Sequence, residues 1–507
     1  MGVFVRRVKT GSGATAVQIV HKRGRRVLSI EHIGSAHTDD ELALLLQVAL
    51  ERRHAGQLAL DLDHAADDDA ADAGAVGASA VVEGTSSLLL WEVLAGIYVD
   101  LGLDRLGDET FRALVLARVI EPASKLDTVR GLTDIGVASP HRVTFMRCLK
   151  RVIERDYRAV IAQACHRHAT RTGTLAVVLY DVTTLHFEAE REDKLRKVGM
   201  SKEHRVDPQV TVGLLTTAVG FPLEVDLFEG NKAETKTLIP VLTRFRKRHQ
   251  AHDIVVVADA GMLSAANLLA LEDNGFRFIV GSRTSKVPYE LQAHVERHGN
   301  YLTDGAAIET TRRMGTGKNA RDRRVVYHYA FKRAQHDNRA INAMVERAEK
   351  VASGERPLKK DRFVTFTDTS TSVDWDLVER ARSLAGIKGY VTNIDPEVMD
   401  GPAVVAAYHD LYQVERSFRM TKSDLAARPV FHRLEDSIQA HLTVVFAALA
   451  ISREAQARSG LSINRILKVL RPLRSATVTI GTQQITAQPR VPRETRPLLN
   501  ALGWSGH

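Results

Sequence analysis

The chain has 507 residues, of which 44% are hydrophobic and 26% charged, a balance that excludes a disordered or a membrane protein and predicts about three folded domains. Lysine and arginine outnumber the acids by 70 to 61, which favours a polyanionic partner without establishing one. The N-terminus has no apolar signal core, no apolar run is long enough to cross a membrane, and the chain has only two cysteines, Cys148 and Cys165. We therefore expect a cytoplasmic protein without a membrane partner.

The first third of the chain divides into three regions. Residues 1–60 combine short alternating apolar segments with an amphipathic run, which predicts a small β-hairpin and helix module. Residues 61–83 are rich in Asp, Ala and Gly and have no periodicity, so they are predicted to be a linker. Residues 84–172 carry helical periodicity and are predicted to form a mainly helical domain.

The remainder of the chain predicts an α/β fold. Residues 173–283 read as β-β-β-α-β-α-β, in which the first three strands can pair as a meander and the later strands suit parallel crossovers. This order is the RNase H-like arrangement. Residues 284–395 interrupt it with a β-rich segment, residues 396–455 are helical and complete the core, and residues 456–507 read as an appended helix, hairpin and tail.

Two aspartates follow buried strands of the predicted core. Asp181 lies in LYDVTT and Asp259 in VVVADAG. Strand ends of an α/β sheet are where ligands and metals collect, and two adjacent strands would bring both carboxylates within bridging distance of a metal ion. Each aspartate alone also fits a strand-end turn or a helix cap.

A third acid, Glu415, lies in the helical stretch AAYHDLYQVERSFRMTKSDL. Tyr408, Glu415 and Lys422 are spaced seven residues apart, close to two helical turns, which places them on one face of a helix. An ordinary charged amphipathic helix has the same spacing, so the stripe alone leaves its role open.

This spacing resembles the Tyr-Arg-Glu-Lys signature of the IS-four-like group of bacterial insertion-sequence DDE transposases. Further segments that resemble the group follow in the expected order over about residues 175–450, and ARVIEPASK resembles the N-terminal region of one subfamily. These segments are GMSKEHRVDPQVTVGLL, GFPLEVDLFEGNKAE, VVADAGMLS, GYVTN and RPVFHRLEDSIQAHL.

The resemblance implies that Asp181, Asp259 and Glu415 are a catalytic triad that binds two Mg²⁺ or Mn²⁺ ions. Carboxylates suit this role because both are hard cations that prefer oxygen ligands. The resemblance also implies that residues 284–395 are the insertion domain of the group and that Tyr408 and Lys422 contact DNA. Leu411 stands where the signature has Arg, and we hypothesise that Arg419, one turn after Glu415, replaces that arginine as a DNA contact.

The implied function is a transposase that binds the terminal inverted repeats of an insertion sequence, cuts them and joins the 3′ ends to target DNA by transesterification. Its partners would be double-stranded DNA, with the domain at 84–172 binding it, and a second copy of the chain in a homodimer. The location would be the bacterial cytoplasm, at the nucleoid. The alternatives are a catalytically inactive, transposase-derived DNA-binding regulator and a metal-dependent RNase H-fold nuclease without strand transfer. The intact triad disfavours the regulator, and the Tyr and Lys stripe disfavours the simple nuclease.

Two further patterns in the core are weaker. Arg244, Arg246, Lys247 and Arg248 form a basic run on one predicted helix, which fits either a DNA track or a solvated face. Asn231 and Glu234 precede that helix and are predicted to cap it.

Overall fold

The computed structural model divides into two compact units, Met1–Ser86 with Arg474–Pro489 and Ser87–Leu473 with Arg490–His507. The predicted linker as far as residue 79, most of the amphipathic run before it and residues 200–206 of the GMSKEHRVDP motif lie outside the described residues. The structure describes residues 2–9, 15–23, 26–36, 41–42, 45–46, 49, 80–171, 173, 175–187, 192–199, 207–251, 253–262, 264–282, 289, 293, 302–357, 361–366, 370–428, 430, 432, 434–480 and 483–504.

The first unit contains two antiparallel three-stranded sheets. One has the order β1-β2-β3 and the other the order β16-β15-β4, so the second joins a strand from the first hundred residues to the C-terminal hairpin. The bounds of their strands are β1 Gly2–Lys9, β2 Thr15–Arg23, β3 Arg26–Ala36, β4 Ala80–Ser86, β15 Ser475–Ile480 and β16 Gln483–Ala487.

The second unit is built on a mixed sheet of eight strands in the order β10-β11-β14-β9-β8-β5-β6-β7. The three central strands β5, β8 and β9 are parallel and the outer pairings are antiparallel. Every residue of β8 is buried, as expected for a parallel strand covered on both faces. The strands are β5 Val177–His186, β6 Gln209–Thr217, β7 Pro222–Glu229, β8 Val255–Ala258, β9 Arg277–Ser282, β10 Ala307–Met314, β11 Arg321–Tyr329 and β14 Ile387–Thr392.

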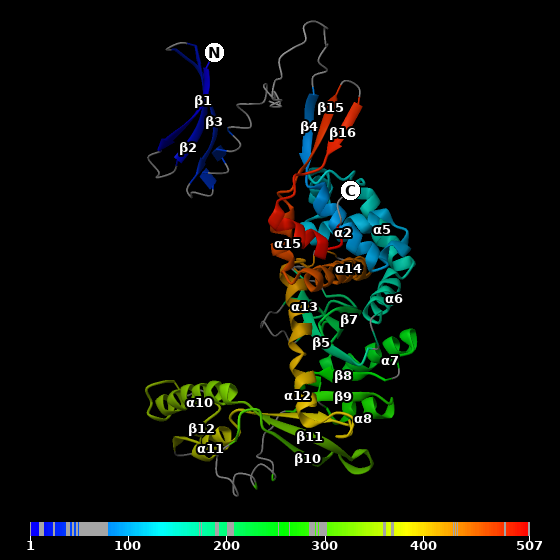
Figure 1. Cartoon of the computed structure of the whole chain (residues 1–507). Coiled ribbons are helices and arrows are strands. Elements are labelled where there is room, and N and C mark those ends of the chain that lie inside the picture. Colours follow the sequence, from blue (N-terminus) through cyan, green and yellow to red (C-terminus); the bar gives the residue numbers. More distant parts are fainter. Residues whose placement is uncertain are drawn as a thin grey trace. The chain divides into compact units, whose positions relative to one another are not determined.

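Helices cover both faces of this sheet, as Figure 1 shows. From β5 to β9 the chain follows the predicted order, with α7 and α8 between the last strands. Helix α14 is apolar almost all round and contacts α2, α3, α5, α6 and β7, which is the environment that such a helix requires. The helices are α2 Leu88–Asp100, α3 Glu109–Ile120, α4 Lys125–Asp134, α5 Arg142–Glu154, α6 Tyr157–Ala169, α7 Leu238–His249, α8 Ala265–Asp273, α12 Gly401–His409, α13 Tyr412–Ser423, α14 Glu435–Ser459, α15 Ile463–Leu470 and α16 Arg496–Ala501, with short 3₁₀ turns η1 Leu103–Leu106, η2 Glu234–Lys236, η3 Ala260–Met262, η4 Gly317–Asn319 and η5 Arg493–Thr495.

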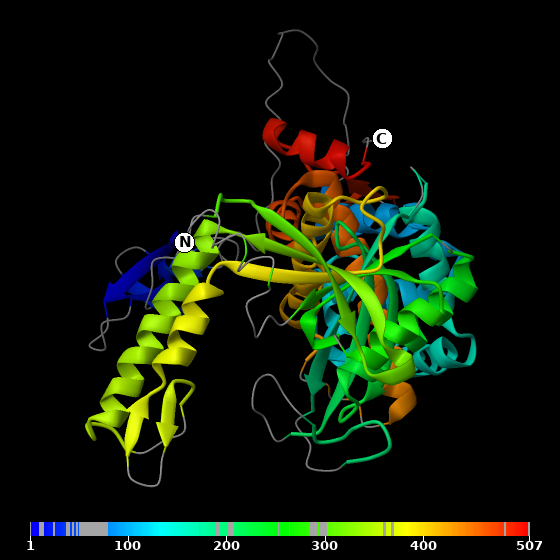
Figure 2. The same ribbon diagram turned by 90° about the horizontal axis from the view of Figure 1, so that it is seen from below.

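Between β11 and β14 the chain leaves the sheet and builds a small body of its own. It consists of α10 Phe331–Ala352, β12 Val364–Phe366, β13 Thr371–Val373 and α11 Trp375–Ser383, with the two helices side by side (Figure 2). Its apolar residues form a separate core cluster that includes Ile341, Val345, Phe363 and Val378. Within the described part of the chain, every helix is too short or too polar to cross a lipid bilayer.

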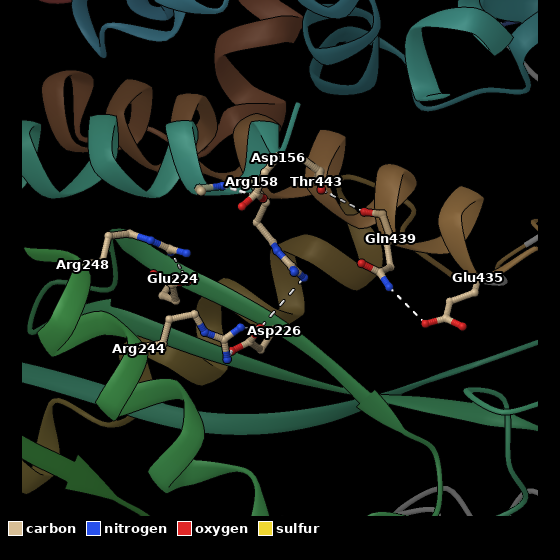
Figure 3. A network of polar contacts seen from close by, with 10 residues as sticks. Asp156, Arg158, Glu224, Asp226, Arg244, Arg248, Glu435, Gln439 and Thr443 are labelled. Carbon is tan, nitrogen blue, oxygen red and sulfur yellow. Dashed lines mark hydrogen bonds and ion pairs between the residues drawn. The ribbon is translucent and has the colours of Figure 1, made fainter. Parts of the chain in front are cut away.

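The basic run on α7 has a structural role that the sequence did not predict. Glu224 and Asp226 on β7 are only 1% and 4% exposed, and both are paired with arginines (Figure 3). Arg244 donates to Asp226 over 2.9 Å, Arg248 pairs with Glu224, and Arg158 of α6 lies 3.9 Å from Asp226. Buried carboxylates require such partners, so this part of the run stabilises the sheet–helix interface.

Candidate active site

The two aspartates lie on adjacent parallel strands. Tyr180 of β5 pairs with Ala258, the last residue of β8, so Asp181 is the next residue of β5 and Asp259 directly follows β8. Adjacent strands are about 4.8 Å apart, which brings the two backbones close together. Asp181 is half-buried and Asp259 is exposed. Strand β5 continues past Asp181 to His186 because β6 still pairs with it there, so Asp181 marks the end of β8 and not the end of its own strand.

Glu415 on α13 shares a cavity with Asp181. The cavity has a volume of about 330 Å³, and Arg419, Lys422 and Arg428 bring positive charge to its wall. Two of the predicted acids and two of the predicted DNA contacts therefore lie around one space. The other residues that line it are Val182, Thr183, Phe418 and Ser423.

Tyr408 on α12 is buried, at 4% exposure, and its hydroxyl donates a hydrogen bond of 3.0 Å to Oδ1 of Asp259. Burial and the neighbouring Asp259 carboxylate raise the pKa of Tyr408, so the hydroxyl remains a donor. A Cβ atom at Gly281 would lie 2.5 Å from this hydroxyl, which explains the glycine on the neighbouring β9. The geometry makes Tyr408 a positioning residue for Asp259, while the predicted contact with DNA stays a prediction.

The predicted stripe is divided between two helices. The chain tightens between α12 and α13, where the N–H of Leu411 bonds to the Tyr408 carbonyl at 3.0 Å and the N–H of Val414 to the Leu411 carbonyl at 3.2 Å. These i to i+3 bonds wind the backbone more tightly than an α-helix does. Leu411 is 5% exposed and packs in the main apolar core. The position of the signature arginine is therefore occupied by a core residue, while Arg419 is exposed at the acid cavity.

Lys388 of β14 is a residue near the site that the sequence analysis missed. Its ammonium lies 4.4 Å from the centre of the Tyr408 ring. Burial and Arg333 lower the pKa of Lys388, and the carboxylates of Asp259 and Glu415 oppose this shift, so its charge lies near both acids. In the sequence, the feature that could have indicated Lys388 is its position directly before the GYVTN segment.

Glu234 is also placed differently from its prediction as a helix cap. The N-cap of α7 is Thr237, which makes no side-chain cap, and Glu234 begins the 3₁₀ turn η2 that precedes the helix. Instead, Oε2 of Glu234 would lie 2.9 Å from a Cβ atom at Gly261, two residues after Asp259. A further carboxylate therefore lies near the turn that follows β8.

The donor chemistry of the site fits a hard divalent cation, because the three predicted ligands are carboxylates. Oδ1 of Asp259 is held by the tyrosine hydroxyl, which fixes the direction of its second oxygen. Among the residues that the structure describes, no group of three or more His, Cys, Asp or Glu side chains is arranged to hold a metal ion. The structure thus brings the acids to one region without forming a closed set of ligands.

Comparison with known proteins identifies the family. A family model described as "Transposase DDE domain" matches residues 172–451, which include all three acids. No curated protein sequence matches the chain. Among solved structures, the chain is similar to the piggyBac transposase synaptic complex with hairpin DNA, with 10% identity, coverage of 76% of this chain and 79% of that one, and a TM-score of 0.40. It is also similar to the Mos1 transposase paired-end complex with the left transposon end, with 14% identity, coverage of 46% of this chain and 65% of that one, and a TM-score of 0.16. Because the family model spans more than half of the chain, the protein belongs to the transposase DDE domain family and is a DDE transposase.

Proposed function

We propose that the protein is a cut-and-paste transposase of the IS-four-like group. It binds the terminal inverted repeats of an insertion sequence, cuts them by phosphodiester hydrolysis and joins the freed 3′ ends to target DNA by transesterification. The observation that carries the proposal is the position of Asp181 and Asp259 on adjacent parallel strands, with Glu415 on the cavity that Asp181 lines. The strand order β7-β6-β5-β8-β9 supports an RNase H-like core.

Asp181, Asp259 and Glu415 would hold two Mg²⁺ or Mn²⁺ ions. When bound, such a pair supplies the Lewis acidity that activates the attacking oxygen and stabilises the leaving oxygen. Tyr408 supports this role because its hydrogen bond fixes the rotamer of Asp259.

The basic side chains around the acids would bind the phosphate that is cut. Lys422, Arg419 and Arg428 line the same cavity as Asp181 and Glu415, so a phosphodiester there would meet carboxylates and cations together. Charge-assisted hydrogen bonds from lysine and arginine to phosphate are short and strong, and they fix the strand against the acids. Two element ends have to be cut and joined together, which fits a homodimer on DNA.

The test is a cleavage assay with the purified protein, Mg²⁺ or Mn²⁺, and duplexes carrying the ends of the element that encodes it. Asp181→Asn keeps the size of the side chain and removes its charge, so we expect it to bind the ends and cut none. Asp253→Asn is the matched control, because Asp253 is exposed before the opposite end of β8, and we expect it to cut like the wild type.

Each alternative has its own outcome in this assay. Cleavage by Asp181→Asn at the wild-type rate would contradict the assignment of the site. Specific binding of the ends without cleavage by the wild type would instead identify a DNA-binding regulator. Cleavage without joining of 3′ ends to target DNA would identify a nuclease that lacks strand transfer.

A further inference from the structure

Four basic side chains from separate segments converge on a second, smaller cavity. Arg118 comes from α3, Lys125 begins α4, His432 precedes α14 and His441 lies on α14. The cavity has a volume of about 30 Å³, and its lining includes no carboxylate among the residues that the structure describes. The other lining residues are Leu114, Ala123, Thr128, Leu149 and Val444.

One buried ring nitrogen and one guanidinium of this cluster have no partner among the described residues. Lys125 and His432 satisfy each other, because Nζ of Lys125 donates a hydrogen bond of 3.4 Å to Nε2 of His432, and the rings of His432 and His441 are 5.1 Å apart. His441 is 7% exposed, and its Nε2 is buried without a hydrogen-bond partner in the described part of the chain. None of the hydrogen bonds or ion pairs found among the described residues engages Arg118. Buried polar groups are normally paired, so the free nitrogen of His441 and the guanidinium of Arg118 leave this cavity able to bind a ligand.

The charge of the cluster indicates the sign of that partner. Burial lowers the pKa of Arg118, while burial and then Arg118 lower that of Lys125. Burial, Lys125 and Arg118 lower the pKa of His432 to about 4, and burial, Arg118 and His432 lower the pKa of His441 well below its ordinary value. No carboxylate opposes any of these shifts. Unpaired buried cations are costly, and an anion in the cavity would remove that cost and let His441 take a proton.

The size of the cavity fits part of a phosphate group. Since a water molecule needs about 10 to 15 Å³ of such space, the cavity has room for about two water-sized groups. Two non-bridging oxygens of a phosphodiester have this size. Lys125 and His432 are only half-buried, so both side chains also reach solvent.

The cluster lies close to the acid cavity along the chain. Arg428 lines the acid cavity, and His432 follows four residues later. Four extended residues span at most about 14 Å, or about four nucleotide steps at 3.4 Å of helix axis per strand. The N–H of Val430 bonds to the His186 carbonyl at 3.3 Å, which ties the connecting segment to β5.

We propose that Arg118, Lys125, His432 and His441 form a phosphate-binding site that holds one backbone phosphate of the DNA strand in the acid cavity, a few nucleotides from the cut. The identity of the ligand as DNA rests on the proposed function. The four residues lie in ARVIEPASK and RPVFHRLEDSIQAHL, two segments to which the sequence analysis assigned no role.

The experiment compares Lys125→Gln with Arg130→Gln in the full chain. Both substitutions remove one positive charge from α4, but Arg130 is exposed and lies outside the cavity. Affinity for duplexes carrying the element ends is measured without metal between about 50 and 200 mM salt. Loss of one phosphate contact lowers the slope of log K against log salt by about 0.9, so the affinity ratio of wild type to Lys125→Gln changes about 3.5-fold over that range. Arg130→Gln keeps the wild-type slope.

A second measurement separates DNA from free phosphate. Inorganic phosphate should raise the melting temperature of the wild type more than chloride of equal ionic strength, and Lys125→Gln should lose this difference. Stabilisation by phosphate with an unchanged DNA slope would mean that the site binds a free oxyanion only, which overturns the proposal. Equal slopes for both variants, with wild-type cleavage intact, would overturn this inference and leave the proposed function standing. A wild type that neither binds nor cuts the ends would overturn both.

Discussion

The substitution Tyr408→Phe removes a single hydroxyl from the candidate site and keeps the packing of the ring. That hydroxyl donates to Oδ1 of Asp259 over 3.0 Å, and hydrogen bonds to charged groups contribute about 1.5 to 3 kcal/mol. Because Asp259 is exposed, water can take over the bond, and we expect the free energy of unfolding to fall by only about 1 kcal/mol.

The effect on cleavage should be larger than the effect on stability. Water satisfies the Asp259 carboxylate without fixing its direction, so the full 1.5 to 3 kcal/mol can be lost from the transition state. At a factor of ten for each 1.4 kcal/mol, the single-turnover cleavage rate should fall by about 10- to 150-fold. The pKa of Tyr408 is raised above its ordinary value of 10.0, so its hydroxyl stays protonated and the reduction should be constant between about pH 6 and 9.

The assay measures single-turnover cleavage of an element end against Mg²⁺ concentration, together with urea unfolding. Tyr412→Phe is the matched control, because Tyr412 is 56% exposed and its hydroxyl accepts a hydrogen bond of 2.7 Å from the side-chain amide of Gln413. If Tyr408→Phe cuts at the rate of Tyr412→Phe and with the same Mg²⁺ dependence, the hydroxyl does not position Asp259 for the reaction.

Three further predictions concern packing and charge in the second unit. Gly281→Ala places a Cβ atom 2.5 Å from the buried tyrosine hydroxyl, so cleavage should be lost and the melting temperature lowered; a fully active variant would contradict this geometry. Arg323→Met removes a side chain that is 1% exposed and makes two hydrogen bonds to Glu272. The free energy of unfolding, measured in urea, should fall by about 3 kcal/mol, and a fall of less than about 1 kcal/mol would contradict this prediction. Burial raises the pKa of Glu454, but hydrogen bonds from His168 and Arg458 outweigh burial and lower this pKa to about 2. The free energy of unfolding should therefore decline as the pH falls from about 4.5 towards 2, and Glu454→Gln should remove this dependence on pH.

The position of Asp259 at the end of β8 could be predicted because it depends on local sequence, whereas Asp181 lies within β5 and not at its end. The apolar run before Asp259 marks where β8 ends, and the alternation of strands and helices places β5 beside β8. The family resemblance added Glu415, whose neighbourhood alone reads as an ordinary amphipathic helix. The inferences about the two aspartates require only periodicity and chain order.

Side chains that act through tertiary contacts could not be predicted. Tyr408 shares a seven-residue spacing with Glu415, yet the tightened turn between α12 and α13 directs it to Asp259 inside the protein. Glu224 and Asp226 alternate with apolar residues on β7 as on a solvated face, but arginines from α6 and α7 cover them. Lys388 lies far from the acids in sequence, so only the sheet order brings it to the site.

The body between β11 and β14 enters and leaves the sheet through two antiparallel neighbours. Tyr329 and Ile387 are the last paired residues of β11 and β14. The N–H of Ala330 bonds to the Gly386 carbonyl at 2.9 Å, which holds the two chain segments together where the body begins and ends. A tight hairpin turn could join the same two strands without moving either one. The body can therefore be shortened, exchanged or inserted at this one junction without changing the strand register that positions the acids.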